Sequence, residues 1–154
     1  MFQKFVSSLL CLLMFVGCSS SSQASTSKTA DALAQELLSD LSIDGKNMAA
    51  AKARVIKGMV FEGDEIYSDA ALYLSTEIGN SDSVGVFYTE NVDECRSYIG
   101  SYLDSQKAIA QTYNADQVFK ISNAVIEDNG KIVVFVVCDD IEDAKNIVKN
   151  ALNS

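Results

Sequence analysis

Cys18 is the residue whose surroundings point most directly to a chemical role. Lys4 precedes a run over residues 5–16 that is apolar except for two serines, and Gly17, Cys18 and four serines follow. This order of a basic residue, an apolar run, a small residue and a cysteine is typical of a secretory signal with a lipoprotein cleavage site. We therefore predict a signal peptide over residues 1–17, with Gly17 before the cut and diacylglycerol attached to the Cys18 thiol.

The predicted lipid would decide where the protein is located. The apolar run is shorter than the about 20 residues that a membrane-spanning helix needs, which disfavours an uncleaved anchor. Acyl chains such as palmitate on Cys18 would hold the protein stably on the membrane, whose lipid is then its first partner. Residues 18–28 are rich in serine and lack apolar periodicity, so we predict a flexible tether there. The expected location is the extracytoplasmic face of the cell membrane.

Cys95 and Cys138 are the other cysteines of the predicted mature chain. In an exported protein they could form one disulfide. Both occupy apolar positions of their segments, which favours two buried free thiols, and the sequence leaves both alternatives open. Because the sequence contains no His, neither thiol has the usual partner of a nucleophilic cysteine.

Two acidic clusters contain the oxygen ligands that hard cations such as calcium prefer. The first consists of Glu62, Asp64, Glu65 and Asp69, and the second of Asp139, Asp140, Glu142 and Asp143. Neither has the spacing of an EF-hand calcium loop. The favoured interpretation is a solvated loop for the first cluster and the capped start of a helix for the second. We predict no metal site and no cofactor, although cation binding by the first cluster stays an open alternative.

Catalytic motifs are scarce in this sequence. The absence of His excludes a Ser-His-Asp triad and any His-containing zinc site, and no glycine-rich phosphate-binding motif occurs. Carboxylate pairs could serve as acid and base, but no spacing selects a pair. Tyrosines could line a ligand pocket, although core positions are the favoured interpretation for Tyr67, Tyr73, Tyr98, Tyr102 and Tyr113. We therefore predict no catalytic residue and no enzymatic activity.

Composition narrows the classes of partner. The chain has 12 Lys+Arg against 21 Asp+Glu, a formal net charge of −9, and loss of residues 1–17 removes Lys4 but no acidic residue. Such an acidic chain repels the phosphates of nucleic acids and the anionic surface of a membrane. Hydrophobic residues make up 48% of the sequence, which favours a folded core over a disordered chain.

Hydrophobic periodicity predicts a single domain over residues 29–154. Helices are predicted over residues 29–41, 47–57, 91–113 and 141–152. Asn91 can cap the third of these helices, with Glu94 three residues on, and Asp139 and Asp140 can cap the last. Strands are predicted over residues 71–75, 84–88, 121–127 and 132–138. The inner face predicted for the helix over residues 91–113 consists of Val92, Cys95, Ile99, Tyr102, Ile109 and Tyr113.

These elements predict an α+β fold, with two N-terminal helices followed by a ββαββα unit. Its four strands form an antiparallel sheet packed by helices. Asn129 and Gly130 predict a two-residue hairpin turn with positive φ at both positions. The apolar run over residues 132–138 predicts a central strand buried on both faces. We expect one face of the sheet to meet the long helix and the C-terminal helix, and the other to meet the N-terminal helices or a partner.

Several short motifs, taken in order, resemble a known family. They are Tyr73-Leu74-Ser75, Val84-Gly85-Val86-Phe87, Tyr113-Asn114-Ala115-Asp116-Gln117-Val118, Asn123-Ala124-Val125-Ile126, Asn129-Gly130-Lys131 and residues 132–139. In this order the sequence resembles the domain of unknown function 4358 family of short Firmicutes lipoproteins. The resemblance implies an N-terminal lipobox and a location in the cell envelope. The family has no assigned activity, so the resemblance implies no reaction and no functional residues.

The expected function is that of a membrane-anchored extracytoplasmic lipoprotein of unknown molecular activity. A non-catalytic binding or assembly module of the cell envelope is the favoured interpretation. Its partner would be an envelope protein or a second copy of the chain, and not a nucleic acid. The alternative is a lipoprotein that binds a small molecule, either a solute or a metal.

Overall fold

The computed structural model describes residues 28–41, 43 and 47–154. The predicted signal peptide, Gly17, Cys18 and most of the predicted tether lie outside these residues, so the predictions made for them stay predictions. None of the helices in the described part of the chain has the length and apolar character needed to cross a membrane.

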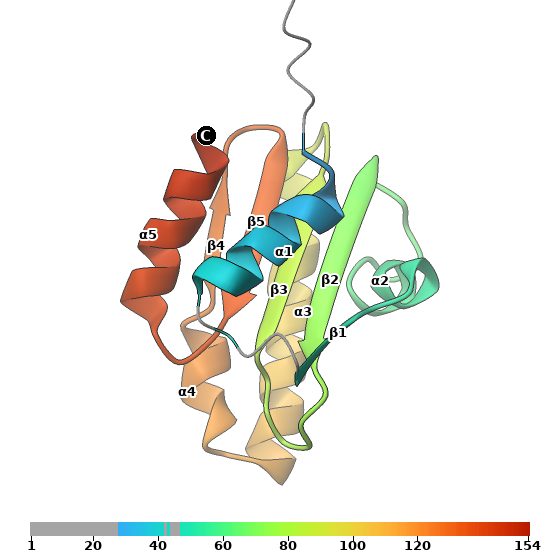
Figure 1. The fold of residues 1–154 in the computed structure, drawn as a ribbon. Coiled ribbons are helices and arrows are strands. Elements are labelled where there is room, and N and C mark those ends of the chain that lie inside the picture. Colours follow the sequence, from blue (N-terminus) through green and yellow to red (C-terminus); the bar gives the residue numbers. More distant parts are fainter. Residues whose placement is uncertain (1–27, 42, 44–46) are drawn as a thin grey trace, which may run out of the picture.

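One antiparallel sheet forms the centre of the molecule (Figure 1). The elements in chain order are α1 (Ala30–Asp40), β1 (Met48–Ala50), α2 (Ala53–Met59), β2 (Asp69–Ser75), β3 (Ser83–Tyr88), α3 (Val92–Tyr113), α4 (Gln117–Ser122), β4 (Val125–Asp128), β5 (Ile132–Val137) and α5 (Ile141–Leu152). The strand order across the sheet is β1-β2-β3-β5-β4, and every neighbouring pair is antiparallel. The predicted α+β class is therefore confirmed.

Helices cover both faces of this sheet. On one face, α1 and α5 enclose a core with side chains such as Val84, Val86 and Val134. On the other face, α2, α3 and α4 enclose a second core with Phe87, Val133 and Phe135. Figure 1 shows α1 crossing in front of the strands and α3 lying behind them. Because both faces are covered, β3 and β5 are buried along nearly their whole length, as the apolar run over residues 132–138 predicts.

Local side-chain caps explain where three of the helices begin. Thr29 Oγ1 accepts a hydrogen bond from the amide of Ala32, which starts α1. Asn91 starts α3 and Asp140 starts α5, and each accepts a hydrogen bond from the amide three residues on. The last two caps are those that the sequence predicts.

A fifth strand is the first departure from the predicted fold. The sequence predicts a helix over residues 47–57, but β1 pairs with the end of β2, with Met48 opposite Ser75 and Ala50 opposite Tyr73. The helix α2 begins only at Ala53. Alanine has the highest helix propensity, but such intrinsic preferences are small compared with tertiary interactions, so pairing with the open edge of β2 overrides this one. The predicted four-stranded sheet is therefore wrong by one strand, which occupies the first part of the second predicted helix.

The segment before β5 also differs from its prediction. The predicted strand over residues 121–127 is split into the end of α4 and the short strand β4. The hairpin from β4 to β5 has three connecting residues, and among Asn129, Gly130 and Lys131 only Gly130 has a positive φ, at 87°. Asn129 keeps an ordinary φ because its Oδ1 accepts the amides of Lys131 and Ile132, which closes the turn through its side chain.

The C-terminal helix packs on the other face from the one predicted. The sequence predicts that it shares a face with the long helix, but Ala144, Val148 and Leu152 of α5 belong to the core that α1 encloses. The crossing from β5 to α5 therefore leads away from α3. As a result α3 and α4 share their face with α2 alone.

Candidate functional site

The first acidic cluster is divided among separate structural contacts. Asp64 accepts a hydrogen bond from the hydroxyl of Tyr98, which together with burial raises the pKa of Tyr98 to about 12. Glu65 pairs with Lys57 at 3.0 Å. Asp69 Oδ2 accepts the first amide of α1 at 2.7 Å. In the described part of the chain, no three acidic, Cys or His side chains converge as metal ligands would.

The second acidic cluster surrounds the start of α5. Asp140 Oδ1 accepts the amide of Asp143 at 3.1 Å, and Glu142 and Asp143 lie in the first turn, where carboxylates favourably oppose the helix dipole. This arrangement confirms the predicted helix start. Asp139 is the exception, because its carboxylate lies 3.0 Å from the ammonium of Lys120.

The two cysteines of the domain are free and buried, which agrees with the favoured interpretation. They lie in the two different cores, Cys138 on the α1 face of the sheet and Cys95 on the α3 face. Burial raises the pKa of the Cys95 thiol to about 12 and that of Cys138 to about 11. Both thiols therefore stay protonated near neutral pH, which is the opposite of what a nucleophile requires.

The tyrosines fall into different environments. Tyr102 is buried with 6% exposed surface, and its ring centroid lies 5.8 Å from that of Phe135. Tyr73 is half-buried and donates a hydrogen bond to Asp31, which fastens α1 to β2. Tyr113 is 84% exposed, so its predicted place on the inner face of α3 is wrong. Ile109, also predicted to face inward, is 53% exposed.

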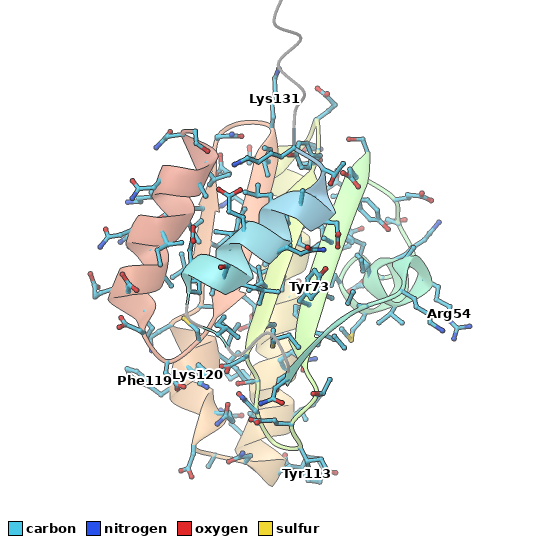
Figure 2. The ribbon with its side chains drawn as sticks, viewed as in Figure 1. Arg54, Tyr73, Tyr113, Phe119, Lys120 and Lys131 are labelled. Atoms are coloured by element: carbon cyan, nitrogen blue, oxygen red, sulfur yellow. The ribbon has the colours of Figure 1, made fainter. Side chains whose placement is uncertain are left out.

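These two side chains lie at one end of the molecule, which we call the hairpin end. It consists of the β2–β3 turn (residues 76–82), the C-terminal half of α3 from residue 104, and α4. The large hydrophobic side chains that are exposed in the described part of the chain are Ile78, Ile109, Tyr113 and Phe119. All four lie at the hairpin end, and Figure 2 shows Tyr113 at the bottom of the view and Phe119 higher up, at the lower left.

The opposite end of the sheet, which we call the α1 end, receives the chain from its N-terminal side. The hydroxyl of Tyr88 donates to the carbonyl of Lys28, next to the start of α1. Tyr88 is the last residue of β3, whereas Ser83, beside the β2–β3 turn, is the first. Five steps along a strand span about 17 Å, so Lys28 and the hairpin end lie on opposite sides of the molecule.

A groove of about 320 Å³ opens at the hairpin end between the β2–β3 turn and α3. Its apolar lining consists of Ile109, Ala110, Tyr113 and Ile121, and its polar lining of Gly79, Asn80, Ser81, Gln106, Asn114 and Gln117. Two cross-links hold the walls together. The amide of Asn114 donates to the carbonyl of Gly79 at 2.6 Å, and the hydroxyl of Ser81 donates to Gln117 Oε1 at 2.7 Å.

A buried ion pair stabilises the floor behind this groove. Lys120 has 7% exposed surface, and its Nζ lies 2.7 Å from Asp82 Oδ1 and 3.0 Å from Asp139 Oδ1. Burial alone lowers the pKa of Lys120, but the hydrogen bonds to both carboxylates outweigh that effect and raise it. The ammonium group therefore stays charged and ties α4 to the β2–β3 turn.

A smaller cavity of about 190 Å³ adjoins the groove and shares Asn80, Ser81, Gln106 and Ile121 with it. Tyr102 lines this cavity, and its hydroxyl makes no hydrogen bond to another residue in the described part of the chain. In the described residues no fully buried side-chain oxygen or nitrogen lacks a partner, so this hydroxyl is open to the cavity, where it can bind water or a small ligand.

Sequence reasoning missed the parts of this site that depend on distant segments. Lys120, Asp82 and Gln117 were assigned no role, since their contacts join segments more than 30 residues apart. A signal was present at Lys120, a charged residue between Phe119 and Ile121 in an otherwise apolar run. Such a position indicates a lysine that needs a buried carboxylate partner.

The fold and the groove together define a small antiparallel α+β domain with a preformed surface site. The sequence model described as a domain of unknown function (DUF4358) matches residues 62–138, which is half of the chain. The protein therefore belongs to the DUF4358 family, and the resemblance described from the motifs is confirmed. The match extends from just after α2 to just after β5 and includes every residue that lines the groove. No curated protein and no solved structure matches the chain.

Proposed function

We propose that the protein is an extracytoplasmic lipoprotein that acts as a non-catalytic binding or assembly module of the cell envelope. Acyl chains on Cys18 would hold it to the membrane. The support for the anchor comes from the sequence, in which Lys4, an apolar run, Gly17 and Cys18 follow one another as in a lipoprotein signal.

One observation carries the binding role, namely that the exposed large apolar side chains of the described chain are gathered at the hairpin end. Exposed apolar side chains that line a groove, as Ile109 and Tyr113 do, are typical of interaction sites, and aromatic residues are enriched in them. Lys28, which leads toward the proposed anchor, lies at the α1 end. The groove would then face away from the membrane and toward other envelope components.

The anchor is tested by replacing the proposed lipid acceptor. We expect Cys18→Ala to abolish labelling by a palmitate analogue and to leave the precursor with its signal uncut. Cys11→Ala is the matched control, because Cys11 lies within the predicted signal and accepts no lipid. Equal labelling of the Cys18→Ala variant and the wild type would contradict the anchor.

The binding role is tested by the native mass of the protein extracted from membranes in mild detergent. The wild type should migrate in a complex, and Tyr113→Ala should release the monomer, because exposed aromatic anchors carry a large share of interface energy. Lys131→Ala, at the opposite end of the molecule in Figure 2, should leave the complex intact. A wild type that migrates only as a monomer would contradict a binding or assembly role.

Small-molecule binding is the second candidate, and the cavity beside Tyr102 favours it. Tyr102 and Gln106 both line this cavity and make no hydrogen bond to other residues among those described, so they are available to a solute. A thermal-shift screen with amino acids, sugars and metal salts tests this candidate. We expect a hit to depend on Tyr102, so that Tyr102→Phe removes the shift and Tyr113→Ala keeps it. The absence of any hit would remove the candidate.

A further inference from the structure

The groove at the hairpin end is held open before any partner arrives. The β2–β3 turn is fastened to the end of α3 by the Asn114–Gly79 hydrogen bond and to α4 by the Ser81–Gln117 hydrogen bond. Gly79 has a φ of 82°, and a Cβ there would lie 3.0 Å from the Asn114 amide nitrogen, so the two walls meet closely. Binding to such a preformed groove avoids the entropy cost of ordering it.

The side chains around the groove indicate what it can accept. Ala110 and Ile121 form an apolar floor, and Ile109 and Tyr113 form an exposed apolar wall. Tyr113 presents a rigid ring whose surface is 84% exposed. A bulky apolar side chain of a partner would cover this surface and remove it from water.

The charge around the groove is negative. Carboxylates at the hairpin end belong to Glu77, Asp82, Asp104 and Asp116, and ammonium groups to Lys107 and Lys120. Lys120 is already neutralised by its buried pairs with Asp82 and Asp139. Asp116 is exposed next to the groove and forms no ion pair within the described chain. Together with the net charge of −9, this arrangement attracts a cationic partner.

Two other occupants fit these observations less well. An anionic lipid surface would be repelled by the acidic domain, and the groove lies at the end opposite Lys28. A second copy of the chain would bring an equal negative charge to the same place, and like charges across an interface are unfavourable.

We propose that the groove binds a cationic amphipathic segment of another envelope protein, which inserts a bulky apolar side chain against Ile109 and Tyr113 and places Lys or Arg near Asp116. This inference rests on the proposed binding role and specifies the chemistry of the partner. It does not depend on whether the protein is lipidated.

The test places a photo-crosslinking residue in the groove of the full-length protein in cells. The substitution Tyr113→p-benzoylphenylalanine keeps an aromatic ring at an exposed position, so the fold is preserved. The crosslinked peptide is then sequenced by mass spectrometry. We expect a segment of a different protein that carries apolar residues at helical or strand spacing flanked by Lys or Arg. The same residue placed at Lys131, at the opposite end, should not give this adduct.

The outcomes separate this inference from the proposed function. A peptide from a different protein with an acidic or uncharged segment would keep the binding role and overturn the cationic partner. An adduct with a second copy or with lipid would also overturn the inference. The absence of any adduct at Tyr113 would overturn both.

Charge is tested by a second pair of variants in washed membranes. Asp116→Asn should lower the adduct yield about threefold at low salt, and the difference from wild type should vanish at high salt, because exposed charges are screened. Glu90→Gln is the matched control, since Glu90 is exposed and follows Tyr88 at the α1 end. An adduct yield that does not respond to Asp116→Asn or to salt would contradict an electrostatic contribution.

Discussion

The substitution Gly85→Ala is the sharpest test of the core behind the groove. Gly85 lies in the middle of β3 and pairs with Phe135 of β5. A Cβ at this position would meet the Phe135 ring, with Cδ1 at 2.7 Å, and would lie 2.9 Å from Cε2 of Phe87. Carbon atoms in good contact are about 3.5–4.0 Å apart, so the Phe135 ring would have to move by about 1 Å.

The surrounding rings decide how much this movement costs. Phe135 is fully buried, and its ring centroid lies 6.1 Å from that of Phe87 and 5.8 Å from that of Tyr102. Moving a ring that packs against two others disturbs those contacts as well, and overpacking a core in this way costs about 1–3 kcal/mol or more. We expect Gly85→Ala to lower the free energy of unfolding by about 3 kcal/mol and the Tm by about 10 °C.

Urea unfolding followed by circular dichroism measures this change, and two variants control it. Gly100→Ala is the matched control, because a Cβ at Gly100 in the middle of α3 would meet nothing within 4 Å. It should stabilise the protein by about 0.5–1 kcal/mol through helix propensity. In a Phe135→Leu background the cost of Gly85→Ala should fall to about 1 kcal/mol, since the obstructing ring is gone.

The result that would refute this reasoning is specific. If Gly85→Ala lowers the free energy of unfolding by less than about 1 kcal/mol, the Phe135 ring does not lie over Gly85. An equal cost with and without Phe135→Leu would place the conflict elsewhere, for example in the backbone of β3.

Three further predictions concern buried and capping groups. Lys120→Met should lower the free energy of unfolding, measured with urea, by about 2 kcal/mol because it leaves the Asp82 carboxylate without its cation. Adding Asp82→Asn should recover part of this loss, since the unpaired charge is then removed. Cys95 and Cys138 have raised pKa values in the fold, against an ordinary value of 9.0, so above about pH 9 the unfolded chain releases thiol protons first. These thiols should therefore not affect the free energy of unfolding below pH 9, and each should lower it by about 1.4 kcal/mol per pH unit above pH 9. A free energy of urea unfolding that stays constant up to pH 10 would contradict their burial. Asp69→Ala removes the acceptor of the first amide of α1, which should cost about 1 kcal/mol and speed hydrogen exchange within α1 but not within α3.

Much of the fold follows from signals that lie close together in the sequence. The apolar run over residues 132–138 predicts a central strand, and β5 lies between β3 and β4. Asn91 and Asp140 predict the starts of α3 and α5, because a cap needs only a side chain and an amide three residues on. Local interactions of this kind do not depend on the rest of the chain, so the sequence alone determines them.

The intrinsic preference of a segment was overridden where a distant segment provided stronger interactions. Residues 48–50 favour a helix by composition, but the edge of β2 supplies backbone partners that the isolated segment lacks. The candidate site was hidden for the same reason. Its exposed wall was assigned to the core, since helical spacing shows which residues share a face of α3 but not how far the sheet beneath extends.

The sequence by itself determined the α+β class, the central strand, the two helix caps and the membership of a family with no assigned activity. The tertiary structure alone decided that α5 packs beside α1, that Tyr113 and Ile109 are exposed, and that Lys120 meets Asp82. These features depend on contacts between residues far apart in the chain. Such contacts are set by which surfaces remain free once the sheet has formed, and no local pattern contains that information.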